Sequence, residues 1–152
     1  MPYRAFISYS HAADGKLATA LQSALHRFAK PYYRRRAIDV FRDQTSLSIT
    51  PALWPAIEKA LSESEYFILM ASPEAAASHW VKQEVDYWLK YKTADRILIV
   101  LTEGEIVWDN AAGDFDWGRP TALPENLKKA FAQEPLYLDL RWAKQEEDLS
   151  FH

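Results

Sequence analysis

Short apolar runs alternate with segments of helical periodicity along this chain, and that pattern restricts its fold more than any other feature. The apolar runs lie at residues 3–9, 37–41, 66–71, 96–101 and 136–140. Between the first two runs, Leu17, Leu21 and Leu25 recur at helical spacing and predict an amphipathic helix that ends before Pro31. Strands that alternate with helices predict a parallel sheet covered by helices. We therefore expect an α/β fold with five strands.

Further helices are expected between the later strands. Leu53, Ile57 and Leu61 predict one helix, and a second helix carries Glu84 after the third apolar run. A long polar loop follows the fourth run and leads into a short predicted helix at 124–133. Residues 142–152 resemble the start of a helix with too little apolar surface to finish a layer. We therefore expect residues 1–152 to form a single domain excised from a longer protein.

The composition excludes several classes of protein. The chain has 152 residues, of which 49% are hydrophobic and 14% aromatic, and this suits one globular domain with a core. It has no cysteine, which excludes a disulfide framework and a thiol nucleophile and favours a reducing cytoplasmic setting. We find no signal sequence and no run of about 18 apolar residues, so no membrane association is expected. A net charge of -3 gives no general attraction to nucleic acid, and the basic residues 34–36 are expected to be solvated.

The segment after the third apolar run combines an aromatic residue with a carboxylate. Trp80 and Glu84 are four residues apart, so on a helix they lie on one face. Open α/β sheets bind ligands outside the carboxyl ends of their strands, and Glu84 should lie near such an end. Alternatively, Glu84 is a solvated residue that complements the helix N-terminus, worth about 0.3–1 kcal/mol. Trp80 either packs or stacks on a ligand, whereas Trp88 is expected in the core.

Other catalytic patterns are not supported. Ser10, His11 and Asp14 include the residue types of a hydrolase triad, but they lie within five positions and lack a Gly-x-Ser-x-Gly elbow. Four glycines in the chain form neither a Gly-x-Gly-x-x-Gly fingerprint nor a Walker loop. The histidines and aspartates show no metal-binding spacing, so we expect no metal site.

Four short motifs occur in a fixed order. They are Phe-Ile-Ser-Tyr-Ser at 6–10, Val-Phe-Arg-Asp at 40–43, Ala-Ser-Pro at 71–73 and Trp-x-x-x-Glu at 80–84. Together they resemble the ordered motifs of a Toll/interleukin-1 receptor (TIR) domain, and the resemblance covers essentially the whole chain. Phe-Arg-Asp-Gln followed by Leu-x-x-x-Pro-x-Leu-Trp is similar to the prokaryotic branch of this family.

The resemblance implies a flavodoxin-like three-layer sandwich with a five-stranded parallel sheet. It also implies self-association with other TIR domains through the 42–51 loop. In the enzymatic branch, the glutamate that Glu84 matches cleaves NAD+ to nicotinamide and ADP-ribose or a cyclic isomer, so NAD+ is a substrate and no cofactor is expected. The implied setting is bacterial antiphage defence or immune-like signalling. The alternative is a non-enzymatic scaffold that mediates homotypic interactions in signal transduction.

The resemblance places the substrate against the end of the first strand and the loop after the second. The implied substrate-binding residues are Tyr9, Ser10, His11, Arg42, Asp43, Trp54, Trp80 and Lys82, with Glu84 as the catalytic residue. His11 is only partly cationic at neutral pH, so Arg42 or Lys82 is expected to contact the pyrophosphate. Ser10 has a second interpretation, as part of a turn and helix cap. Trp54 is either an aromatic wall of the pocket or a core anchor.

Overall fold

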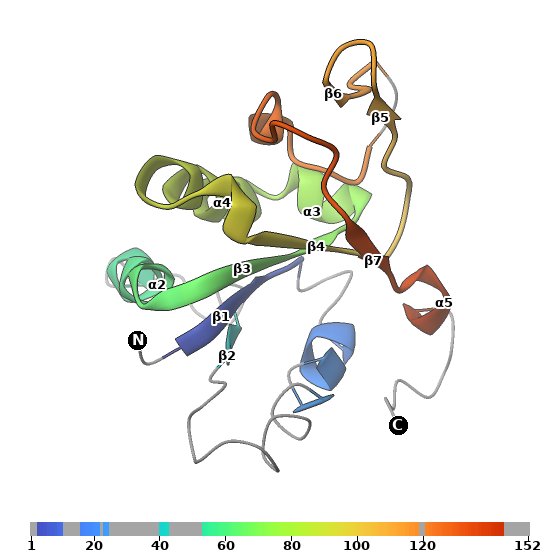
Figure 1. Ribbon diagram of the computed structural model, residues 1–152. Coiled ribbons are helices and arrows are strands. Elements are labelled where there is room, and N and C mark those ends of the chain that lie inside the picture. The colour runs from blue at the N-terminus through green and yellow to red at the C-terminus, as the bar shows by residue number, and fades with distance from the viewer. Residues whose placement is uncertain are drawn as a thin grey trace.

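A five-stranded parallel sheet forms the centre of the protein (Figure 1). The computed structural model describes residues 3–10, 16–21, 23–24, 40–42, 53–118 and 121–144. The strands of this sheet are β1 (Tyr3–Ser8), β2 (Val40–Arg42), β3 (Ser64–Ala71), β4 (Ile97–Leu101) and β7 (Tyr137–Asp139). They are ordered β2-β1-β3-β4-β7, and every neighbouring pair is parallel. This is a flavodoxin-like strand order, and the predicted α/β fold is confirmed.

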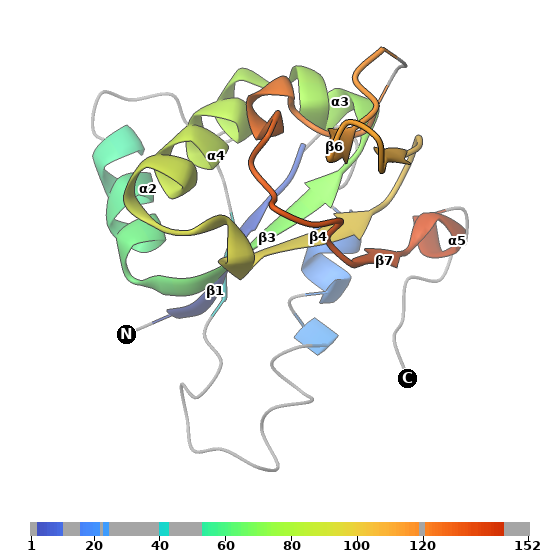
Figure 2. The ribbon, with the colours of Figure 1, turned by 45° about the horizontal axis from the view of Figure 1, so that its top comes forward.

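Helices cover both faces of the sheet (Figures 1 and 2). One face carries α2 (Leu53–Ser62), α3 (Pro73–Ala77) and α4 (His79–Tyr91). The helical residues 16–21 and 23–24 lie on the opposite face, where α5 (Arg141–Lys144) also contributes to the core. The protein is therefore a three-layer sandwich with a separate core on each side of the sheet.

Alternate residues of each strand enter different cores. In β1, Phe6 joins the core beneath α2 and α4, whereas Ile7 joins the core on the other face. In β3, Leu69 joins the core beneath α2 and α4, and Met70 joins the core on the other face. This alternation follows from the period of two in a strand, and it explains why strands covered on both faces are apolar throughout.

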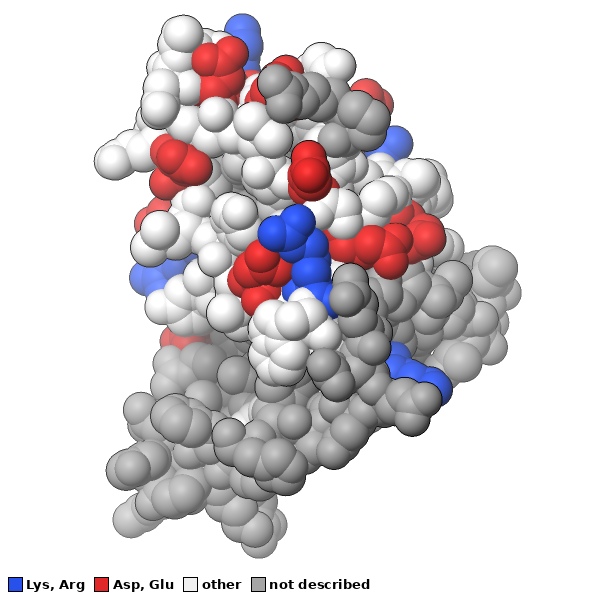
Figure 3. All heavy atoms as spheres, turned by 90° about the vertical axis from the view of Figure 1, so that its right-hand side faces the viewer, with Lys and Arg blue, Asp and Glu red and all other residues white. Residues whose placement is uncertain are grey.

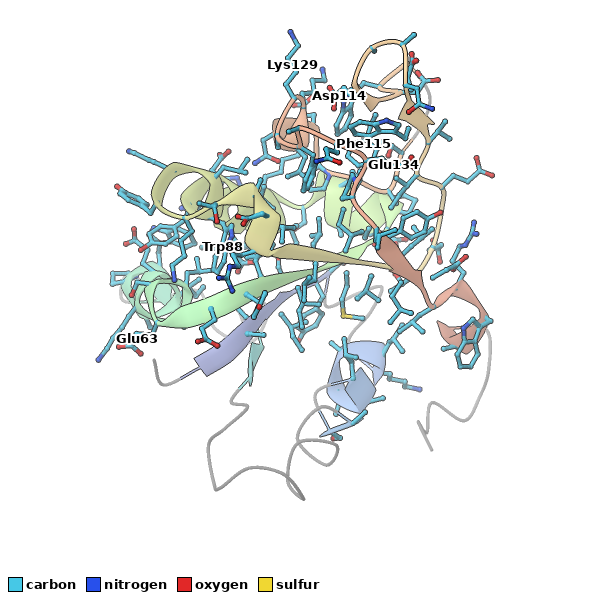
Figure 4. All side chains as sticks on the ribbon, viewed as in Figure 1. Glu63, Trp88, Asp114, Phe115, Lys129 and Glu134 are labelled. Carbon is cyan, nitrogen blue, oxygen red and sulfur yellow. The ribbon has the colours of Figure 1, made fainter. Side chains whose placement is uncertain are left out.

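Trp88 anchors the core between α4 and the sheet, as predicted (Figure 4). Its side chain is fully buried, and its ring centroid lies 5.4 Å from that of Phe67. The indole Nε1–H donates a hydrogen bond of 2.9 Å to the carbonyl of Thr93. Lys92 Nζ lies 4.8 Å from the centre of the same ring. Trp88 therefore fixes the C-terminal half of α4 against β3.

The segment between β4 and β7 differs from the sequence-based prediction. It contains a short antiparallel hairpin of β5 (Trp108–Asp109) and β6 (Asp114–Phe115), and the predicted helix at 124–133 is wrong. Only a single 3₁₀ turn forms, η2 (Glu125–Leu127). Lys129 adopts a left-handed conformation with φ 59°, and its N–H donates to Asp114 Oδ2 at 3.0 Å (Figure 4). Because the Lys129 N–H is bonded to a side chain of the hairpin, it is not available to a helical carbonyl, and the helix does not continue.

Arg141 joins the end of β7 to the loop after β4. Its guanidinium donates to Asp139 Oδ2 at 2.7 Å and to the carbonyl of Gly104 at 3.1 Å. Figure 3 shows the face that carries β7 and α5, where basic and acidic side chains lie beside one another among the described residues. Charges on the described part of this face are therefore mixed in sign.

Candidate active site

Two serine caps set the direction of α4. Ser72 caps α3 by accepting the Ala75 N–H at 3.0 Å, and Ser78 caps α4 by accepting the Val81 N–H at 3.3 Å. Ser78 has an extended backbone (φ -74°, ψ 125°), so the chain changes direction between the two helices. Serine is favoured at such positions because its hydroxyl satisfies a free N–H of the first turn. The predicted helix after β3 is thus two helices, and Glu84 lies in the second turn of α4.

Glu84 faces the core of the protein. The buried residues of α4 are Val81, Glu84, Val85 and Trp88, which recur at spacings of three and four. The Glu84 side chain is fully buried, so it is not the solvated helix residue of the alternative interpretation. Burying a carboxylate is unfavourable unless hydrogen bonds compensate for the lost water.

Ser8 provides such a hydrogen bond. Its hydroxyl donates to Glu84 Oε1 over 2.6 Å, and both side chains are fully buried. Ser8 is the last residue of β1 and lies opposite Leu69 of β3, on the face of the sheet that α4 covers. A hydroxyl-to-oxygen distance of about 2.5–2.7 Å is typical of a hydrogen bond to an ionised carboxylate. The pair therefore joins the carboxyl end of the sheet to α4.

Two tryptophans meet where α2 and α4 begin. Trp54 in the first turn of α2 and Trp80 in the first turn of α4 have ring centroids 6.2 Å apart, with planes inclined by 35°. α2 and α4 lie side by side over the same face of the sheet (Figures 1 and 2). Both rings are partly exposed, and Trp54 also packs against the core. Trp80 is one turn from Glu84 on the same helix face, so these aromatic rings are available to a ligand that approaches the carboxylate.

Two predicted residues lie elsewhere. Tyr9 follows Ser8 in the chain and is buried in the opposite core with Leu17. Lys82 is two residues from Glu84, so an α-helix turns the two side chains about 200° apart. A separate pocket of about 220 Å³ is lined by Ala76, Lys82, Trp117, Thr121, Leu123, Glu125 and Lys128. The structure therefore does not bring the side chains of Tyr9 and Lys82 to Glu84.

The remaining predicted residues are described only in part. Ser10 is partly buried just beyond β1, and Arg42 is the last residue of β2, paired with Ile7. The side chain of Arg42 is not described, and His11 and Asp43 lie outside the described residues, as does most of the 42–51 loop. Their assignment to the substrate site stays a prediction.

Sequence reasoning missed Ser8 as a member of the site. A signal was present, because Ser8 follows the apolar residues 5–7 as a polar residue, two positions after Phe6 on the same face of the strand. The resemblance implies its neighbour Tyr9, but strand periodicity places adjacent residues on opposite faces. Only the residue that shares a face with Phe6 can reach α4.

Among the described residues, no three histidine, aspartate or glutamate side chains gather closely enough to hold a metal ion. None of the helices in the described ranges is long and apolar enough to cross a membrane.

Comparisons with known proteins agree with this architecture. The sequence model of a family described as TIR domain matches residues 5–149. A relative named NAD(+) hydrolase ApTIR, from Actinoplanes sp., is 56% identical over 149 residues, which is 98% of this chain but 21% of the relative. The chain thus spans about a fifth of that protein's length.

A solved structure supports the fold. The TIR domains in the structure of the activated Roq1 resistosome directly recognising the pathogen effector XopQ superpose with a TM-score of 0.50. The match covers 65% of this chain and 57% of that one, at 22% identity, so it bears on the fold alone. Because the family match extends over nearly the whole sequence, the chain belongs to the TIR domain family.

Proposed function

We propose that this domain is an NAD+ glycohydrolase in which Glu84 is the catalytic residue. The observation that carries the proposal is the buried, hydrogen-bonded carboxylate of Glu84 at the carboxyl end of the sheet, one helical turn from Trp80, which is paired with Trp54. The identity to a relative named NAD(+) hydrolase supports the same substrate. A role in bacterial defence or immune-like signalling is part of the proposal.

The chemistry suits a single carboxylate. Nicotinamide is bound to the ribose as a pyridinium, so it leaves as a neutral molecule and takes the electron pair of the broken C1'–N bond. No general acid is needed, unlike ordinary glycoside hydrolysis, in which one carboxyl protonates the leaving oxygen. An ionised Glu84 stabilises the positive charge that develops at C1'.

Attack on C1' completes the reaction. When water attacks, its oxygen forms the new C1'–O bond and one proton is released to solvent, so the products are nicotinamide, ADP-ribose and a proton. When an adenine nitrogen attacks instead, a cyclic isomer forms. Trp80 and Trp54 offer flat faces on which the nicotinamide or adenine ring stacks.

Burial of Glu84 bears on how the enzyme is controlled. The carboxylate has no exposed surface in the isolated domain, so NAD+ reaches it only after a change that uncovers it. If a small fraction of molecules is open at a time, the observed turnover falls by that fraction. Self-association through the 42–51 loop is the proposed event that populates the open state. Turnover per subunit is then expected to rise with protein concentration.

The second candidate is a non-enzymatic scaffold that assembles with other TIR domains. Complete burial of Glu84 is compatible with it, because NAD+ cannot reach the carboxylate unless a change uncovers it. The two functions differ in whether nicotinamide is released.

The deciding experiment compares the parent chain with Glu84→Gln. Glutamine keeps the size of the side chain and an oxygen that can accept the Ser8 hydrogen bond, but it removes the negative charge. We expect nicotinamide release from NAD+ to fall by a factor on the order of 10²–10³ while the unfolding midpoint changes little. The assay is run at several protein concentrations and with a crowding agent. Release that persists in Glu84→Gln contradicts the catalytic role, and no release by the parent under any condition favours the scaffold.

A further inference from the structure

Ser8 connects the sheet to Glu84 across 76 positions of the sequence. Both side chains are inaccessible to solvent, and their 2.6 Å hydrogen bond is the described contact between the end of β1 and this carboxylate.

Both partners are held by rigid elements. Ser8 lies in an interior strand, because β1 is paired with β2 on one side and with β3 on the other. The rotation of α4 is fixed by Val81, Val85 and Trp88, which are all fully buried. A carboxylate on a packed helix still has side-chain freedom, so the hydroxyl of Ser8 selects one orientation of the Glu84 side chain.

We propose that Ser8 is a positioning residue for the reaction, acting through Glu84; this inference rests on the proposed function. The Ser8 hydroxyl donates a hydrogen bond to the carboxylate and orients it for charge stabilisation at C1'. Neither Ser8 nor Glu84 has exposed surface in this arrangement. The proposal assigns contact with NAD+ to Glu84 once the site opens, and orientation of that carboxylate to Ser8.

The chain offers a matched control. Ser64 is the first residue of β3 and is also fully buried, but its hydroxyl donates at 2.7 Å to the carbonyl of Ala60 in α2. Ser64→Ala removes a buried serine hydroxyl from a neighbouring strand without touching Glu84. Any general effect of losing such a hydroxyl appears in both variants.

Ser8→Ala and Ser8→Cys test the role of the hydroxyl. Alanine removes the donor, whereas cysteine fills a similar volume with a much weaker donor. We expect kcat for nicotinamide release to fall roughly 10- to 100-fold in both variants, as for a lost hydrogen bond to a charged group, with KM for NAD+ within about twofold. Ser64→Ala is expected to keep the parent kcat even if its unfolding midpoint falls by as much as that of Ser8→Ala.

The outcomes separate this inference from the proposed function. Parent-like kcat in Ser8→Ala, or full recovery in Ser8→Cys, overturns the positioning role while leaving Glu84 as the catalytic residue. Release that persists in Glu84→Gln, or is absent in the parent, overturns the proposed function and the positioning role together. If Ser8→Ala does not fold, Ser8→Cys supplies the test, because its volume is close to that of the parent.

Discussion

Replacing Trp88 with phenylalanine tests whether the core beneath α4 is packed as described. Phenylalanine is smaller by about three heavy atoms, and at about 0.8 kcal/mol per buried group this reduces the free energy of unfolding by about 2 kcal/mol. The indole N–H that donates to the Thr93 carbonyl at 2.9 Å is also lost, which adds about 1 kcal/mol. The expected total is about 3 kcal/mol. For a domain of this size that lowers the unfolding midpoint by roughly 6–12 °C.

Trp142→Phe is the control for this substitution. Trp142 in α5 is 59% exposed, so the same chemical change there should alter stability by less than about 0.5 kcal/mol. Thermal unfolding of the two variants is followed by far-ultraviolet circular dichroism, with chemical unfolding as a second estimate of the free energy. Equal midpoints for the two variants would refute the placement of Trp88 at the centre of the core.

Two further predictions concern the site and the edge of the sheet. Trp80→Ala should raise KM for NAD+ by about tenfold while lowering the unfolding midpoint by less than about 3 °C, whereas Trp80→Phe keeps a ring and most of the affinity; an unchanged KM in Trp80→Ala argues against stacking. At Asp139, the hydrogen bonds from Arg141 lower the pKa of the carboxyl below its ordinary value of 3.8. The folded state therefore binds this proton less readily than the unfolded chain. The resulting stabilisation is present above that ordinary pKa and is lost as pH falls through the lowered one. The difference in unfolding midpoint between the parent and Asp139→Asn should thus shrink below about pH 4, and a difference that stays constant with pH contradicts the ion pair.

The strands, the order of elements and the core position of Trp88 follow from local patterns in the sequence. The Ser8–Glu84 contact does not, because it depends on which face of β1 meets α4. In a sheet covered on both faces, Phe6 and Ile7 are equally apolar, so periodicity divides the strand into two sets without saying which set α4 covers. Which set of β1 residues faces α4 is decided by long-range packing.

Two other differences have separate causes. The position of Lys82 could have been inferred from the sequence, since residues two apart on a helix point in nearly opposite directions. The absence of the helix at 124–133 could not have been inferred, because the group that accepts the Lys129 N–H is Asp114, 15 residues earlier in the hairpin. Helix propensity carries no information about such a competitor.

The burial of Glu84 links the stability of the domain to its proposed activity. Ser8 offsets part of the cost of burying this carboxylate beneath α4, because its hydroxyl donates a short hydrogen bond to Oε1. The same contact would orient the charge once substrate arrives, so one interaction serves both the closed and the reactive state. In the proposed mechanism, the residues that cover the carboxylate change between these states, while the Ser8–Glu84 hydrogen bond is kept. An event that uncovers a site already formed needs to shift only one equilibrium, and a few kcal/mol of contact between neighbouring domains is enough to do so. The proposed control of activity by assembly therefore requires only a modest interaction free energy between domains.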